Sequence, residues 1–203
     1  MQRPDAKKFE SLDTSLPIWS RFFMLAPLAV VGTREEGGYD LAPKHMVTPM
    51  GFDNFIGFVC TPDHSTYHNV AETGEFTMSF PKPDQTLITA LSASPRQEAI
   101  PKPEQIIDCL PTLKATQTDA LFLADSYLLL ECEHFKTVDG FGRNSLITGR
   151  IRRAFVDRHY LRLSDQDPQQ MLHENPLLAY IAEGRFARVA DTYHFPFPKG
   201  FKR

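Results

Sequence analysis

The chain has 203 residues, of which 42% are apolar and 23% charged, and its formal net charge is −3. This length fits one domain, and we expect residues 1–203 to form a single one. The charge shows no basic excess, which argues against nucleic-acid binding. The longest apolar run, Phe22 to Val31, is interrupted by Pro27 and is shorter than the ~20 residues that a membrane helix needs.

The N-terminal residues and the cysteines indicate a cytoplasmic protein. The start of the chain, MQRPDAKKFESLD, is charged and lacks the apolar core of a signal peptide. Cys60, Cys109 and Cys132 are odd in number and widely spaced, which predicts reduced, mostly buried thiols rather than a zinc site or redox pair. His64 and His68 can share one helix face, but the glutamate of an HExxH zinc motif is missing. We therefore expect no metal.

Strand signals dominate the first third of the chain. Residues 1–20 predict a polar arm with a short hydrophobic anchor at Ile18 and Trp19. Apolar and β-branched runs then predict three strands, and two glycines in the turn at residues 35–38 permit a hairpin between the first two. The predicted strands are Leu25 to Thr33, Tyr39 to Lys44 and Phe55 to Cys60.

A helix and a half-buried strand are expected next. Ser65 can cap a helix that continues to about Thr73, and Gly74 suits its C-terminal end. Residues 75–80 alternate between large apolar and small polar side chains, which predicts a strand. A second helix is predicted from Asp84 to Ala93, with an inward face formed by Leu87, Ile88 and Leu91.

The remaining elements make the chain mainly β. Residues 94–104 contain three prolines and predict a loop over the mouth of a site. The longest strand signals predict a hairpin that turns at residues 139–142. Its strands are Tyr127 to Val138 and Ser145 to Val156, and short helices are expected at Gln169 to Glu174 and Leu177 to Ala182. Antiparallel hairpins of this kind favour a closed or half-closed barrel with a few appended helices and a C-terminal extension at 157–203.

Several short motifs, in order, resemble the flavin reductase-like family. Residues 39–43 (YDLAP) resemble the family's Gly-x-Asn-Leu-Ala-Pro turn, with Asp40 in the place of Asn and His45 where Ser is often found. Residues 65–69 (STYHN) resemble its Lys-Asp-Thr-x-x-Asn helix start. The other matches are VGTR at 31–34, ETGEF at 72–76 and TGRI at 148–151. Together these motifs are stronger than any one of them.

The resemblance implies an FMN-binding antiparallel split β-barrel with Greek-key connections. It also implies a homodimer in which NADH or NADPH reduces the flavin, which then passes electrons to free flavin, oxygen or a partner protein. Hydride transfer between nicotinamide and flavin requires that the protein stack the two rings, so no catalytic side chain is predicted.

The residues divide the expected FMN site into a phosphate seat and a slot for the flavin ring. A helix N-terminus offers free N–H groups to a phosphate. The predicted seat is Thr61, Ser65 and Thr66 with positive charge from Lys44 and Arg150, although Ser65 taken alone would be a simple helix cap. The predicted slot is Leu41, Ala42, Pro43, Met46 and Cys60, with His45 as a hydrogen-bond donor. Ordinary core packing stays open for Met46 and Cys60.

Three functions follow from this pattern. The leading one is an NAD(P)H-dependent flavin reductase. The second is an FMN-binding electron carrier that another protein reduces. The third is an interaction module without a cofactor, which the departures at Asp40 and His45 motivate.

Overall fold

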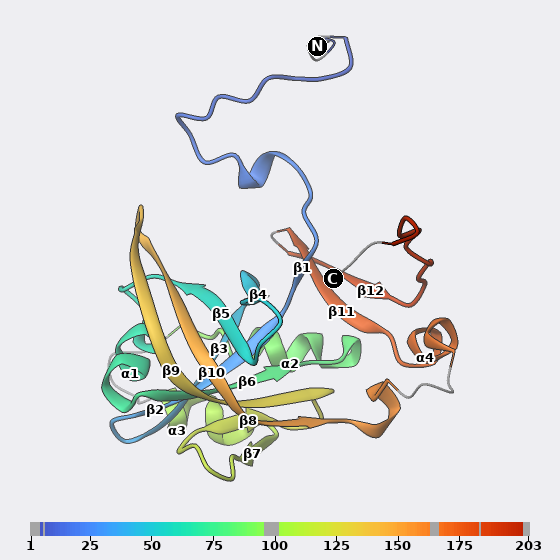
Figure 1. The fold of residues 1–203 in the computed structure, drawn as a ribbon. Helices are drawn as coiled ribbons and strands as arrows, with labels where there is room; N and C mark the ends of the chain where they lie inside the picture. Colours follow the sequence, from blue (N-terminus) through green and yellow to red (C-terminus); the bar gives the residue numbers. More distant parts are fainter. Residues whose placement is uncertain (1–4, 6, 96–101, 163–166, 183, 201–203) are drawn as a thin grey trace.

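The computed structural model describes residues 5, 7–95, 102–162, 167–182 and 184–200. Its centre is a curled antiparallel sheet of seven strands in the order β3-β2-β6-β9-β10-β5-β4 (Figure 1). These strands are β2 (Ala29–Glu35), β3 (Gly38–Lys44), β4 (Val47–Pro49), β5 (Phe55–Cys60), β6 (Glu75–Phe80), β9 (Leu128–Phe141) and β10 (Asn144–Val156). The predicted fold class, a mainly β antiparallel split barrel with appended helices, is confirmed.

The concave side of this sheet holds the main core. Phe58, Phe76 and Met78 are completely buried there, and the rings of Phe58 and Phe76 meet edge to face. The edge strand β3 approaches β5, the neighbour of the opposite edge strand β4, where Lys44 contacts Cys60. This contact places the last residue of β3 beside the last residue of β5.

The other face of β6 is covered by a small hairpin, β7 (Thr112–Lys114) and β8 (Leu121–Leu123). The hydroxyl of Thr77 donates a hydrogen bond to the carbonyl oxygen of Leu121, and the hydroxyl oxygen of Ser79 accepts one from the N–H of Leu123. The predicted alternation in β6 is therefore confirmed, but both of its faces are buried.

Helix α1 (Ser65–Thr73) has the predicted bounds, and Gly74 ends it with φ 72°. Its N-cap residue is His64, so the prediction that Ser65 caps the helix is wrong. After η2 (Pro83–Gln85), α2 (Thr86–Leu91) leaves Leu87 exposed, which corrects the predicted inward face. Leu91 is exposed too, and of the three only Ile88 packs on a core cluster.

The predicted loop at 94–104 is only partly seen, because residues 96–101 lie outside the described part of the chain. Its end forms a short helix, α3 (Lys102–Gln105), followed by η3 (Ile107–Cys109). The hairpin of β9 and β10 turns later than predicted: Phe141 still pairs with Asn144, and Gly142, with φ 65°, lies in the turn.

The C-terminal extension forms a second small sheet beside the barrel (Figure 1). After η4 (Arg158–Tyr160), helix α4 (Pro168–Glu174) confirms one prediction, but Leu177–Ala182 forms strand β11, so the predicted helix there is wrong. β11 pairs with the distant β1 (Ala26–Pro27) and with β12 (Arg185–Val189), which directly follows it, and these pairings outweigh the local helix preference. The N-terminal arm, with η1 (Trp19–Arg21), extends away from the body above β1.

None of the described helices is long and apolar enough to cross a membrane.

Candidate functional site

Lys44 is a buried cation at the end of β3. Its Cα partner on β2 is Ala29, a residue of the main core, and opposite residues of paired strands share a face, so the lysine points into the barrel. The residue is 9% exposed, and its ammonium donates a hydrogen bond to Cys60 Sγ at 3.5 Å. No carboxylate among the described residues pairs with it. A buried charge needs a counter-charge, so this position is suited to an anion.

The start of α1 offers hydrogen-bond donors close to this lysine. His64, the N-cap, makes no capping side-chain bond, and across the described residues neither the hydroxyls nor the backbone N–H groups of Ser65 and Thr66 have a partner. Burial first, and then the charge of Lys44, lower the pKa of the His64 imidazole, and α1 contacts β3, the strand that carries Lys44. Free N–H groups at a helix start and an unpaired ammonium together form an anion seat.

Asp40 lies on the same face of β3 as Lys44. Unlike Lys44, it has an oppositely charged partner. Its Oδ1 lies 2.6 Å from the ammonium of Lys102 on α3, and both side chains are at least nine-tenths buried. The same ammonium donates to the carbonyl oxygen of Leu41 at 2.9 Å. Lys102 on α3 therefore neutralises the carboxylate of Asp40, and the charge of Lys44 remains available to a ligand.

A cavity of about 730 Å³ lies between the barrel, the N-terminal arm and β11, and it is lined by His45, the residue after Lys44. The imidazole of His45 stacks on the ring of Tyr180, with centroids 4.5 Å apart and an interplanar angle of 27°. Burial and the nearby charge of Lys44 lower the pKa of His45, which favours its neutral form. None of the residues that line the cavity is Asp, Glu, Lys or Arg; they are Trp19, Ser20, Met24, Leu25, Ala26, Pro27, His45, Met46, Val47, Thr48, Val59, Leu146, Tyr180 and Ile181.

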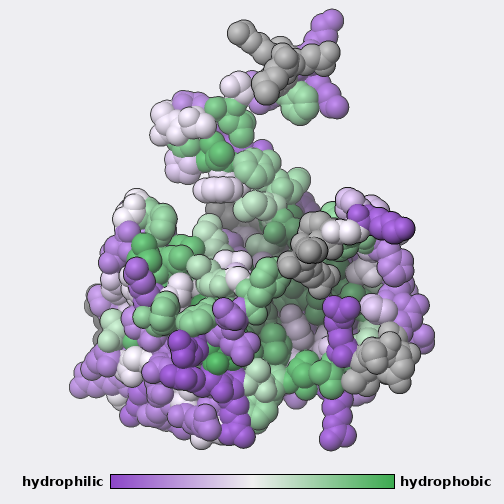
Figure 2. Space-filling model, viewed as in Figure 1, coloured by the Kyte–Doolittle hydropathy of each residue, from purple (hydrophilic) through white to green (hydrophobic). Residues whose placement is uncertain are grey.

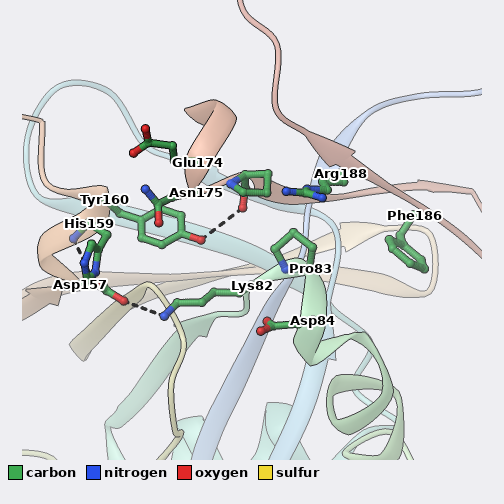
Figure 3. A pocket seen from close by; sticks show the side chains of 11 residues that line it. Lys82, Pro83, Asp84, Asp157, His159, Tyr160, Glu174, Asn175, Phe186 and Arg188 are labelled. Atoms are coloured by element: carbon green, nitrogen blue, oxygen red, sulfur yellow. Dashed lines mark hydrogen bonds and ion pairs between the residues drawn. The ribbon is translucent and has the colours of Figure 1, made fainter. Parts of the chain in front are cut away.

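A second cavity, of about 560 Å³, lies between the end of the barrel and the C-terminal extension (Figure 3). It is strongly polar, and its lysine is already neutralised, because Lys82 Nζ lies 2.6 Å from Asp157 Oδ2. Hydrogen bonds from Lys82 and His159 lower the pKa of Asp157 to about 2. Asp84 and Glu174 add further negative charge to its wall. This cavity is therefore less suited to a phosphate than the seat at Lys44.

A match to a protein family covers most of the chain. Residues 20–182 match the family described as the flavin reductase-like domain. The chain belongs to the flavin reductase-like family. No curated protein matches it significantly.

Solved structures with the same fold have low sequence identity to this family member. The 2-nitrobenzoate 2-nitroreductase of Pseudomonas fluorescens is 16% identical, with a TM-score of 0.73 over 100% of this chain and 99% of the other. An FMN-binding protein from Thermus thermophilus with bound p-hydroxybenzaldehyde is 21% identical, with a TM-score of 0.72 over 93% and 98%. Flavoredoxin from Methanosarcina acetivorans is 19% identical, with a TM-score of 0.72 over 95% and 97%.

The structure brings most of the residues predicted for a flavin site together. Lys44 contacts Cys60, and Thr61 leads from Cys60 to the α1 residues Ser65 and Thr66. His45 and Met46 line the larger cavity, and Ala42 and Pro43 precede them on β3. The cysteines are free, with Cys60 and Cys132 buried and Cys109 exposed. Within the described part of the chain, no group of three or more His, Cys, Asp or Glu residues could hold a metal ion.

Two predicted residues lie apart from this group. Leu41 points to the opposite face of β3 and is completely buried in a second core cluster with Val30 and Leu123. Arg150 pairs with Phe55, whereas Cys60 pairs with Ser145, so the two positions are five residues apart along β10. At about 3.3 Å per residue, that is roughly 16 Å.

Three residues of the site were not expected from the sequence. Lys102 lies in a proline-rich segment that predicts a loop, and Tyr180 in a segment that predicts a helix. Trp19 was expected only as an anchor of the arm, whereas it lines the cavity. Its position beside the apolar run at 22–31 is the one sequence signal that could have indicated this role.

Proposed function

We propose that this member of the flavin reductase-like family is an FMN-binding oxidoreductase in which NADH or NADPH reduces the flavin. The observation that carries the proposal is the buried ammonium of Lys44, which has no carboxylate partner among the described residues and lies beside the free start of α1. His45, the residue after Lys44, lines the larger cavity, which has no Asp, Glu, Lys or Arg in its wall. FMN needs this pair of environments, since its phosphate is anionic and its ring is flat and apolar.

In this proposal the phosphate is held by Lys44, Thr61, Ser65 and Thr66. The ring lies along the bend between β3 and β4, against Ala42, Pro43, His45, Met46 and Cys60. Leu41 supports this wall from the core behind it. Arg150 would have no contact with this seat in the same chain, because of its distance along β10.

When bound, FMN would supply the reversible two-electron chemistry. The residues of this chain would bind and orient it. Lys44 and the N–H groups of α1 neutralise the phosphate, and the apolar walls keep water from the ring. No side-chain acid or base is required for hydride transfer, so the proposal names no catalytic residue.

A homodimer is part of the proposal. The chain exposes large hydrophobic side chains on β9 and in the segment before β5, among them Phe135, Phe141 and Phe52, which are 58%, 58% and 96% exposed. Hydrophobic patches of this kind mark interaction surfaces. Figure 2 shows hydrophobic side chains on the upper rim of the body as well as on the arm. Sedimentation of the purified chain should give twice its mass of 23.1 kDa.

The test is direct reduction of the flavin. The purified protein is loaded with FMN, freed of excess flavin and mixed with NADH or NADPH under anaerobic conditions. We expect the visible absorbance of the oxidised flavin to bleach with at least one donor. A protein that binds FMN but is bleached only by dithionite would be an electron carrier, and a protein that binds no FMN would refute the proposal.

A further inference from the structure

A β-bulge near the tip of the β9–β10 hairpin carries Asp139. The register between the two strands shifts there, so that Asp139 and Gly140 on β9 together oppose Ser145 alone on β10. Gly140 has φ 100°, a conformation that glycine adopts readily. A bulge of this kind re-aims the side chains beside it. Here the carboxylate of Asp139 reaches helix α1, which lies beside the hairpin (Figure 1).

The carboxylate of Asp139 joins the hairpin to this helix. Its Oδ1 accepts a hydrogen bond from the hydroxyl of Ser145 at 2.6 Å and a second one from the hydroxyl of Tyr67 at 3.2 Å. Ser145 is 1% exposed and pairs with Cys60, the residue that contacts Lys44. One carboxylate oxygen therefore connects α1 with the part of the barrel that holds the buried ammonium.

Tyr67 is held at both ends of its side chain. Its ring packs against the main core, and its hydroxyl is bound by Asp139. Tyr67 is the third residue of α1, and its backbone N–H donates to the carbonyl oxygen of His64, the N-cap, at 3.0 Å. Ser65 and Thr66 lie between His64 and Tyr67, so the position of Tyr67 constrains the direction of their N–H groups.

A second contact between the hairpin and the loop before α1 is weaker. In the hairpin turn, Arg143 Nη2 lies 2.9 Å from Asp63 Oδ2, and the two side chains are 87% and 65% exposed. The hydrogen bond from Arg143 lowers the pKa of Asp63. Exposed ion pairs contribute little to stability, so this contact alone does not fix the loop. Asp139 differs, because one of its two donors belongs to the buried Ser145.

We propose that Asp139 is a positioning residue of the phosphate seat, and that it holds the first turn of α1 in the orientation in which Ser65 and Thr66 face the bound phosphate. The proposal rests on the proposed function, because this seat is the one assigned there to the phosphate of FMN. Asp139 acts through Tyr67 and does not itself touch the flavin. Its loss therefore lowers the affinity for a flavin that carries a phosphate and leaves the affinity for the ring unchanged.

Titration of the full chain with FMN and with riboflavin tests this role. Asp139→Ala should weaken FMN binding about three- to tenfold, as expected for the loss of one hydrogen bond in a partly exposed place. Riboflavin, which lacks the phosphate, should bind as tightly as to the unsubstituted chain. A merely structural defect would lower both affinities alike, so the readout is the ratio of the two. An equal loss for both flavins, or no loss for FMN, would overturn the proposal.

Two further variants separate the hydrogen bond from the charge. Tyr67→Phe removes only the hydroxyl donor and should lower the ratio about two- to fivefold, and it takes the place of Asp139→Ala if that variant does not fold. An unchanged ratio in Tyr67→Phe would contradict the proposal. Asp139→Asn keeps an acceptor oxygen and should stay within about twofold of the unsubstituted chain. A loss in Asp139→Asn as large as that in Asp139→Ala would also contradict it.

Thr148→Val is the matched control. The hydroxyl of Thr148 donates to the carbonyl oxygen of Lys136 at 2.7 Å, so this bond joins β10 to β9 within the hairpin. Its loss should lower the stability measured by urea unfolding and leave the ratio of the flavin affinities unchanged. If Thr148→Val lowered the ratio as much as Tyr67→Phe does, any loosening of the hairpin would have this effect, and the specific role of Asp139 would be refuted.

The two proposals give distinguishable failures. A chain that binds no FMN, or that binds FMN and riboflavin equally, has no phosphate seat, and both proposals are then refuted. A chain that binds FMN more tightly than riboflavin, and whose Asp139→Ala and Tyr67→Phe variants keep the same ratio, refutes only the role of Asp139.

Discussion

The ammonium of Lys44 lies 3.5 Å from the sulfur of Cys60, and this contact joins the edge strand β3 to β5. A thiol is a weak acceptor and cannot neutralise a buried cation. Because no carboxylate among the described residues does so either, the contact leaves the lysine available to an anion at the start of α1.

Lys44→Met should weaken FMN binding about 10- to 100-fold, since a hydrogen bond to a charged group contributes about 1.5–3 kcal/mol. Riboflavin lacks the phosphate, so its affinity should not change. Fluorescence titration measures both. Arg150→Met is the control and should leave the FMN affinity unchanged, because Arg150 lies far along β10. A loss of affinity in Arg150→Met but not in Lys44→Met would place the phosphate elsewhere.

Lys102→Met should destabilise the protein by about 3–5 kcal/mol, because it removes the cation from a buried ion pair with Asp40. The double variant Asp40→Asn, Lys102→Met removes both charges and should recover most of the lost free energy of unfolding. Urea denaturation measures the effect. If Lys102→Met cost less than about 1 kcal/mol, the pair would behave like an exposed salt bridge.

Gly32→Ala should also destabilise the fold, by about 3 kcal/mol, since overpacking in a well-packed core is costly. A Cβ at this position would overlap with the carbonyl oxygen of Leu121 and the hydroxyl of Thr77, where the β7–β8 hairpin covers β6. Gly37→Ala is the control. It has open space around it, and with φ 82° it should cost only about 1 kcal/mol. Thermal or urea unfolding of the two variants should show that order, and the reverse order would contradict the close approach at Gly32.

The stability of the flavin-free protein should fall as the pH falls. The folded-state pKa of His45 is lowered below its ordinary value of 6.5 by burial and by Lys44, so the unfolded chain binds the proton more readily. The stabilisation is fully present above pH 6.5 and is lost as the pH falls through the folded pKa. His45→Gln should therefore make the free energy of unfolding less dependent on pH between about 8 and about 5. His64 has a pKa lowered in the same direction, so part of the dependence should remain. A steeper dependence in His45→Gln would contradict the shift.

The parts of the fold that the sequence predicts well are those with a local pattern. The alternation at 75–80, the apolar run at 55–60 and the glycine after residue 73 give β6, β5 and the end of α1 with the observed bounds. Residues 177–182 (LLAYIA) show no alternation of apolar and polar side chains. They form a strand because β1 and β12 pair with them.

The residues of the site likewise divide into those that local motifs predict and those that depend on tertiary contacts. The order of the motifs brings residues 44, 60 and 65 into one region, as predicted. The pairing of Asp40 with Lys102 joins positions 62 residues apart, and nothing local specifies it. The place of Arg150 depends on the register between β5 and β10, and a sequence pattern does not fix that register.

The most direct test of the central claim is a parallel titration of the flavin-free protein with FMN and with riboflavin, which differ by the phosphate. If the phosphate is held by Lys44 and the start of α1, FMN should bind at least about 100-fold more tightly than riboflavin, since several charge-assisted hydrogen bonds are added. Equal affinities for the two flavins, or no binding of FMN, would contradict the account.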